Sequence, residues 1–146
     1  QLAVHDITRK YNAIVWNPFS VESGTVDAPL ARSRKDRKKV AIDQSGRRAV
    51  THYRVLENFK QFAHVECQLE TGRTHQIRVH MSSIGHPLLG DDVYGSGKSP
   101  YNITGQALHA RVLGFIHPRT GKYMEFEAPL PDYFQKILND LESNGR

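Results

Sequence analysis

Hydrophobic and polar side chains alternate along several stretches of the chain with the two-residue period of a β-strand. The stretch 10–16 is apolar on both faces, whereas 62–69 is apolar on one face and polar on the other. Short polar connections suggest two antiparallel hairpins, and residues 20–30 are expected to form a loop around a short strand. The longer strands predicted in this way span residues 10–16, 49–59, 62–69, 107–116 and 122–128.

The C-terminal part of the chain predicts a helix. Its apolar residues recur at i, i+3, i+4 and i+7 and form one stripe, and Pro131 and Asp132 suit a first turn. The stripe consists of Phe134, Ile137, Leu138 and Leu141. Because most strands come in hairpins and helices are few, we expect an α+β fold: a mostly antiparallel sheet with flanking helices.

A shorter helix is expected after Gly72. Thr74 is the expected cap and Gly85 the expected end. The apolar stripe of this helix is Ile77, Met81 and Ile84. At about 100° per residue, Arg78 lies at the flank of the stripe and is partly buried. A buried guanidinium keeps its proton and needs a partner, for which a carboxylate is the natural choice.

Length and composition indicate one compact domain, or part of one, with 146 residues of which 38% are apolar. No run approaches the roughly 18 apolar residues of a membrane helix, and Gln1 opens no signal-peptide pattern. Cys67 is the single cysteine, so an internal disulfide and a zinc cluster bound by cysteines are excluded. Because Cys67 alternates with apolar residues along a predicted strand, we expect its thiol to lie in the core. We therefore expect a cytoplasmic protein. Residues 1–8 lack a start signal, so we expect the chain to begin inside an element.

Positive charge is concentrated in one run of the chain. The net charge is +5, which favours polyanionic partners. Residues 32–39 have no apolar member and form either an ordinary solvated loop or an arm that contacts phosphate. Its six basic residues are Arg32, Arg34, Lys35, Arg37, Lys38 and Lys39.

Eight histidines raise the alternative of a metal site. His75 and His80 lie about 140° apart around a helix axis, whereas helical metal ligands are spaced i, i+4. Glycine-rich nucleotide motifs are absent from the sequence. We therefore expect neither a metal nor a cofactor. Hydrogen-bonding roles are expected for the most suggestive histidines, His75, His80, His86 and His109.

The sequence TGRTHQIRVH, followed by IGHPLLGD and VYG, resembles the RluA-type family of ribosomal and transfer RNA pseudouridine synthases. Further blocks of this family are RKYNAIVW, GTVDAPL and AVTHYRVLE upstream, and ALHARVLGFIHPRTG and FEAPLP downstream. The resemblance spans nearly the whole chain. It implies a pseudouridine synthase fold and a cofactor-free isomerase that converts uridine to pseudouridine in ribosomal or transfer RNA.

The resemblance also implies site residues. Arg78 matches the active-site arginine that pairs with the catalytic aspartate, and Tyr11 matches the tyrosine that lies against the target base. That aspartate belongs to a block beginning HRLD, which precedes this region in the family and does not occur in this chain. Asp91 fits a position that looks structural. We therefore interpret residues 1–146 as the C-terminal part of a catalytic domain, inactive by itself.

Three points stay open in the sequence. Arg73 and His75 either contact RNA phosphate or position their loop. The chain is either part of an active isomerase or a non-catalytic RNA-binding module of the same fold. Strand edges left unpaired by truncation predict self-association. RNA is the expected partner in both cases, and no membrane is expected.

Overall fold

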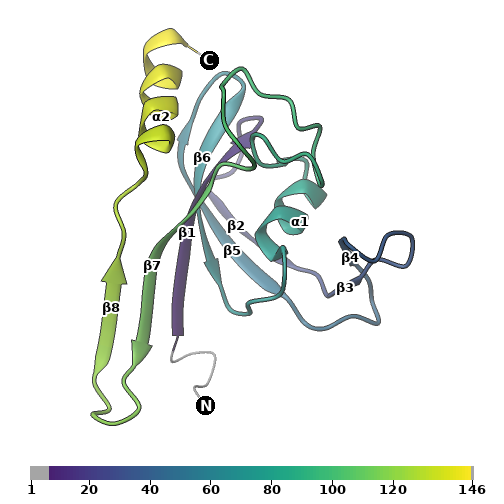
Figure 1. Cartoon of the computed structure of the whole chain (residues 1–146), viewed down its shortest axis with the longest axis vertical. Coiled ribbons are helices and arrows are strands. Elements are labelled where there is room, and N and C mark those ends of the chain that lie inside the picture. Colours follow the sequence, from purple (N-terminus) through teal and green to yellow (C-terminus); the bar gives the residue numbers. More distant parts are fainter. Residues whose placement is uncertain (1–6, 146) are drawn as a thin grey trace.

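The chain folds around a six-stranded antiparallel sheet, with the strand order β2-β5-β6-β1-β7-β8 (Figure 1). The computed structural model describes residues 7–145. A separate two-stranded hairpin joins β3 and β4. The strands are β1 (Ile7–Trp16), β2 (Ser23–Asp27), β3 (Leu30–Arg32), β4 (Val40–Ile42), β5 (Val50–Asn58), β6 (Phe62–Leu69), β7 (Leu108–Ile116) and β8 (Tyr123–Glu127). The helices are α1 (Gln76–Ser83) and α2 (Asp132–Asn144).

Strand β1 is central and uses both of its faces, as its alternation predicts. It pairs antiparallel with β6 on one side and with β7 on the other. Ala13 and Val15 point into one buried cluster, and Ile14 points into another. The predicted hairpins β5–β6 and β7–β8 are confirmed. The predicted α+β fold is therefore correct in class and in its main pairings.

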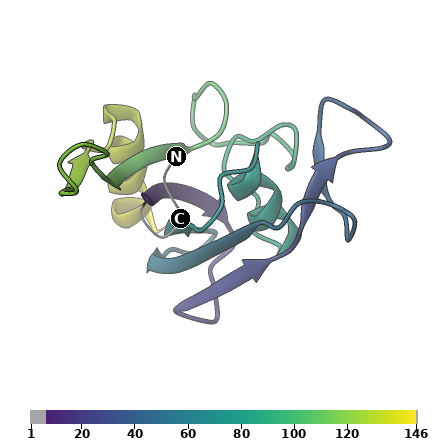
Figure 2. The ribbon, with the colours of Figure 1, turned by 90° about the horizontal axis from the view of Figure 1, so that it is seen from below.

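The two helices cover opposite faces of the sheet (Figure 2). Ile77 and Met81 of α1 pack in the cluster of Ala13 and Val15, which also contains Cys67. All four stripe residues of α2 pack in the cluster of Ile14. In residues 7–145, no helix combines the length and the apolar character needed to cross a membrane.

Two expectations for α1 are wrong. Thr74 is not its cap: the N-cap is His75, in the left-handed region at φ 57°, without a side-chain cap hydrogen bond. Ile84 does not continue the buried stripe, since it is the C-cap and is 37% exposed. The expected end at Gly85 is confirmed, because Gly85 follows the C-cap in the left-handed region at φ 86°. The N-cap differs from the expected one because tertiary contacts fix the turn before α1.

Candidate active site

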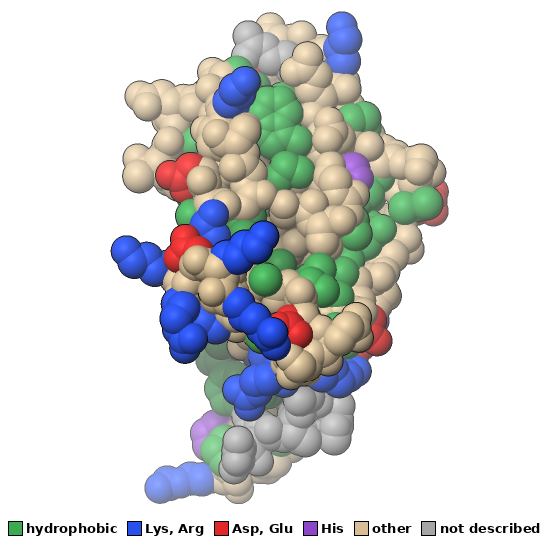
Figure 3. Space-filling model, turned by 90° about the vertical axis from the view of Figure 1, so that its right-hand side faces the viewer, with side chains coloured by type: hydrophobic (Ala, Val, Ile, Leu, Met, Phe, Trp, Pro, Cys, Tyr) green, Lys and Arg blue, Asp and Glu red, His purple; other side chains and the backbone are tan. Residues whose placement is uncertain are grey.

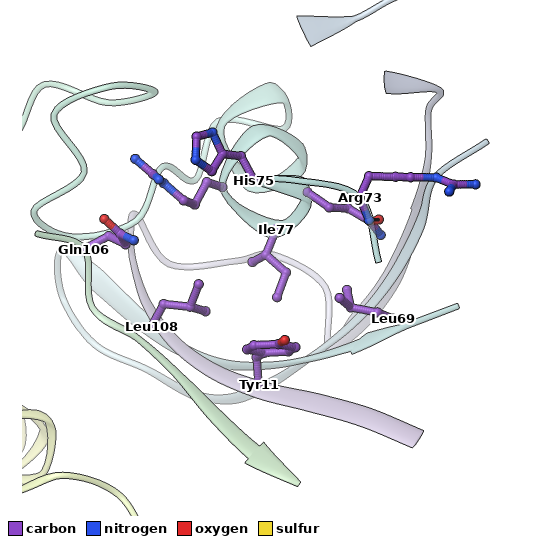
Figure 4. Close-up of a pocket in the computed structure, with 9 residues that line it drawn as sticks. Tyr11, Leu69, Arg73, His75, Ile77, Gln106 and Leu108 are labelled. Carbon is purple, nitrogen blue, oxygen red and sulfur yellow. Dashed lines mark hydrogen bonds between the residues drawn. The ribbon is translucent and has the colours of Figure 1, made fainter. Parts of the chain in front are cut away.

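A cavity of about 220 Å³ opens between the middle of β1 and the start of α1. Tyr11 lies on one wall and faces Ile77, and Leu69 and Leu108 lie on either side of Tyr11 (Figure 4). Polar side chains complete the lining. They are Arg73, His75, Gln76, Arg78 and Gln106. The cavity therefore has an apolar floor around one aromatic ring and a basic, hydrogen-bonding wall.

Tyr11 is positioned by the central place of β1. It is opposite Cys67 of β6 and Ala110 of β7, and a register shift between Lys10 and Tyr11 interrupts the pairing with β7. Its ring packs against the α1-side cluster. The hydroxyl makes no hydrogen bond with any residue in the described part of the chain, so it is available to a ligand in the cavity.

Arg78 is held by a bidentate ion pair with Asp91. Nε donates to Oδ2 over 2.8 Å and Nη2 donates to Oδ1 over 3.0 Å. The side chain of Arg78 is 12% exposed and that of Asp91 is fully buried. The prediction of a partly buried arginine with a carboxylate partner is confirmed. The partner within this chain is Asp91, whereas the resemblance implied an aspartate outside it.

The pair is electrostatically self-consistent. The hydrogen bond with Asp91 raises the pKa of Arg78, and this effect exceeds the opposing effect of burial. Burial alone would raise the pKa of Asp91, but hydrogen bonds from Arg78 and from the backbone of Tyr94 and Val93 outweigh it and leave the pKa lowered. Both groups are therefore charged at neutral pH, which makes the guanidinium a fixed cation at the cavity.

Tyr94 connects the cavity to the β3–β4 hairpin. Its ring lies under the guanidinium of Arg78, 5.1 Å from Cζ to the ring centroid. Its hydroxyl bonds to Nδ1 of His75 at 2.7 Å and accepts the backbone N–H of Val40 in β4 at 2.9 Å. Burial lowers the pKa of His75, and the positive charges of Arg78 and Arg32 lower it further. The negative charge of Asp91 acts in the opposite direction but does not outweigh them. His75 is therefore a neutral hydrogen-bonding partner at pH 7.

Gln76 fixes the turn that carries Arg73 and His75. The buried Oε1 accepts from the hydroxyl of Thr71 and from the backbone N–H of Arg73. Nε2 donates to the backbone oxygen of Val50 in β5. The Nε of Arg73 in turn donates to the backbone oxygen of Arg48 at 2.9 Å. Sequence reasoning missed Gln76 and Tyr94; both stand in motif blocks, but their partners lie on distant segments.

The basic run forms the exposed loop of the β3–β4 hairpin. The hydroxyl of Ser33 accepts the backbone N–H of Asp36, and the carboxylate of Asp36 accepts the backbone N–H of Lys38, so the loop is ordered. Arg32 ends β3, and the side chains of the loop remain in solvent, with only Arg34 near a carboxylate, that of Asp43 at 3.9 Å. Lys and Arg side chains gather on this side of the molecule (Figure 3). The loop is therefore a solvated arm, separate from the cavity that contains Tyr11 and Arg78.

Hydrogen-bonding roles are confirmed for three of the four histidines. His80 is fully buried and bonds to Thr51, and His86 bonds to the backbone oxygen of Trp16. His109 differs, since its buried Nε2 has no partner within residues 7–145. Asn12 lies opposite His109 in the sheet, but its side-chain oxygen already forms a hydrogen bond with Nε2 of His64. Within the described residues, no group of three histidines, acids or cysteines gathers around a possible metal position, and the expectation of no metal stays a prediction.

Comparison with solved structures supports the fold. The human RNA Pseudouridylate Synthase Domain Containing 4 matches with a TM-score of 0.72 and 27% identity over 93% of this chain and 62% of that protein. The human RNA Pseudouridylate Synthase Domain Containing 1 matches with a TM-score of 0.75 over 97% of this chain and 70% of that protein. Its sequence identity is 23%, so this second similarity shows the fold alone.

Sequence comparison identifies the family. An uncharacterized RNA pseudouridine synthase of Bacillus subtilis, YlyB, is 55% identical over 99% of this chain and 48% of the relative. Ribosomal large subunit pseudouridine synthase D of Zymomonas mobilis is 51% identical over 100% of this chain and 49% of the relative. The chain thus spans about half the length of these curated relatives. A family model described as RNA pseudouridylate synthase matches residues 1–83. The chain therefore belongs to the RNA pseudouridylate synthase family, and the resemblance of its motifs to the RluA type is confirmed.

Proposed function

We propose that this chain forms the arginine and tyrosine side of the active site of a pseudouridine synthase that acts on ribosomal RNA. The observation that supports this proposal is that Tyr11 and Arg78, from a central strand and a helix far apart in sequence, line one cavity. Relatives from Zymomonas mobilis and Haemophilus influenzae are named for the large ribosomal subunit, which favours its RNA as the substrate.

The reaction requires bond exchange without oxidation or reduction. The N1–C1′ bond of uridine breaks, the uracil turns, and a C5–C1′ bond forms, while C5 loses a proton and N1 gains one. A carboxylate promotes this exchange either by attack at C1′ or through a glycal. The protein must provide that carboxylate and hold the base during its rotation.

Arg78 is suited to orient such a carboxylate. A guanidinium has five N–H donors, and Asp91 uses one on Nε and one on Nη2. The donors at the far end of the group remain for a second carboxylate, which a nearby cation keeps ionised. In this proposal Asp91 sets the direction of Arg78, and the catalytic aspartate comes from the HRLD block of the longer enzyme.

Tyr11 offers a surface for the uracil. Its ring forms the apolar floor with Ile77 and Leu108, and its hydroxyl has no competing partner among the described residues. A base leaves its stack at a cost of a few kcal/mol, which aromatic and apolar contacts in a pocket help to offset. In this proposal Tyr11 also takes part in removal of the proton from C5.

RNA contact is proposed for the hairpin arm as well. The arm carries six basic residues and is free to meet a polyanion, because only one of them lies near a carboxylate within residues 7–145. When such a cluster neutralises phosphates of RNA, the counterions condensed on the RNA are released, and the affinity for RNA therefore falls as the salt concentration rises. With ribosomal RNA as its partner, the enzyme would act in the cytoplasm.

The test is release of tritium from uridine labelled at C5 in ribosomal RNA. We would assay the chain alone and joined to the part of the Bacillus subtilis relative that this chain does not cover. Release is expected only from the joined protein, and Arg78→Lys should lower it by about 100-fold or more. Arg119→Lys, an exposed change in the β7–β8 turn, should leave release unchanged. A joined protein that binds RNA without release would instead favour a non-catalytic module.

A further inference from the structure

A second hollow lies beside the active-site cavity and shares Arg73 with it. Its volume is about 310 Å³. It is bounded by the β3–β4 hairpin, by the segment before β5, and by the turn between β6 and α1. The lining residues are Ala31, Arg32, Val40, Arg47, Gly72, Arg73 and Thr74.

The hollow is positive and has no counter-charge of its own. Three arginines line it, and no carboxylate does. Arg32, Arg47 and Arg73 form no ion pair with any residue in the described part of the chain. The nearby carboxylate of Glu70 is already bonded by Arg48 and His52. Like charges gathered in this way repel one another unless an anion neutralises them.

Two of these arginines are fixed by the backbone. Arg47 exchanges two backbone hydrogen bonds with Leu30, at 2.9 and 2.8 Å. Arg73 is held through its backbone by Gln76 and through its Nε by Arg48. The guanidinium of Arg73 is therefore held at the hollow, and the backbone that carries Arg47 is fixed, which lowers the entropy lost when an anion binds.

A fourth arginine stands behind the hollow. The guanidinium of Arg9 lies where a Cβ on Gly72 would point, so any larger residue at position 72 would displace it. The Nε of Arg9 is buried and has no acceptor among residues 7–145. Thr74 is exposed at the opening and adds a hydroxyl donor. Guanidinium groups and one hydroxyl thus line the hollow, and such donors suit a phosphate group.

We propose that this hollow binds one backbone phosphate of RNA, next to the uridine that enters the active-site cavity. The proposal rests on the proposed function for the identity of the neighbouring nucleotide. Arg73 borders both spaces, so a base in one and a phosphate in the other belong to adjacent nucleotides. Sequence analysis did not single out Arg47, which lines this hollow and not the active-site cavity.

The test combines removal of the arginine with removal of the phosphate charge. The probe is a strand of about ten nucleotides with one uridine among adenosines. In each version one phosphodiester is replaced by a neutral methylphosphonate, and binding is measured by fluorescence anisotropy. Arg47→Gln should weaken binding of the unmodified strand about fivefold at 0.1 M salt and lower the salt slope by about 0.7, which corresponds to one phosphate contact on a single strand. Arg119→Gln, in the distant β7–β8 turn, is the control.

At the phosphate beside the uridine, methylphosphonate should weaken binding by the unchanged protein and by Arg119→Gln equally, and should weaken binding by Arg47→Gln less. We call the two changes coupled where the loss of affinity caused by methylphosphonate is smaller in Arg47→Gln than in the unchanged protein. Absence of coupling at every position of the strand would overturn the proposal, as would absence of binding at low salt. Coupling spread evenly along the strand would support the phosphate site and refute its position beside the uridine. Coupling without tritium release from the joined enzyme would refute the proposed function and keep the phosphate site.

Discussion

Replacement of Asp91 by asparagine is the most direct test of how Arg78 is held. The substitution keeps the shape of the side chain and removes its charge. Because Arg78 is 12% exposed and Asp91 is fully buried, the change leaves a nearly buried guanidinium without a counter-charge. Removal of one partner of a buried ion pair costs about 3 to 5 kcal/mol of folding free energy.

The lower end of this range is expected for Asp91→Asn. An asparagine oxygen can still accept from the backbone N–H groups of Val93 and Tyr94 and from one donor of Arg78. The ring of Tyr94 also continues to face the cation. We therefore expect a loss of about 3 kcal/mol in the free energy of unfolding, measured at pH 7 by urea denaturation.

Asp92→Asn is the matched control, since its side chain is exposed and adjacent in sequence. It should change stability by less than about 0.5 kcal/mol. Equal losses of unfolding free energy for Asp91→Asn and Asp92→Asn would refute the reasoning, because burial of the carboxylate would then not determine how much its removal destabilises the protein. So would a loss below about 1 kcal/mol for Asp91→Asn.

The same pair predicts a dependence on pH. The pKa of Asp91 is lowered in the folded protein, so its contribution is present above the unfolded value of about 4 and is lost as pH falls through the folded pKa. The stability difference between the unchanged protein and Asp91→Asn should therefore shrink below about pH 4. A difference that stays constant into acid would show that the charge of Asp91 is not the cause.

Three further predictions follow from other contacts. Tyr94→Phe leaves the backbone N–H of the buried Val40 unpaired and should destabilise by about 1 to 3 kcal/mol in urea denaturation, whereas Tyr123→Phe, which is exposed, should not. Cys67 is buried and burial raises its pKa to about 12, so a thiol reagent at pH 8 should react only after denaturation; rapid reaction of the folded protein would contradict this. Phe126 is 53% exposed on edge strand β8, so Phe126→Lys should reduce the mass of any self-associated species in light scattering, and an unchanged mass would place the contact elsewhere.

Local periodicity predicted most elements of this protein, but not the short strands β3 and β4. The alternation in β1 and β6 and the stripe in α2 predicted both their type and their buried faces, because each depends only on side-chain direction along one segment. The core position of Cys67 followed from the same pattern. Motif blocks then indicated the family and brought Tyr11 and Arg78 forward as site residues.

Tertiary structure alone decided how those elements make a site. The partner of Arg78 is set by the loop that returns Asp91 to α1, and no spacing rule specifies that return. The N-cap of α1 is His75, whose side chain bonds to Tyr94, and a local capping rule for Thr74 does not include that distant partner. The hollow around Arg47 requires the β3–β4 hairpin and the turn after β6 to meet. Sequence patterns report the environment along one segment, whereas ion pairs and pockets depend on where separate segments converge.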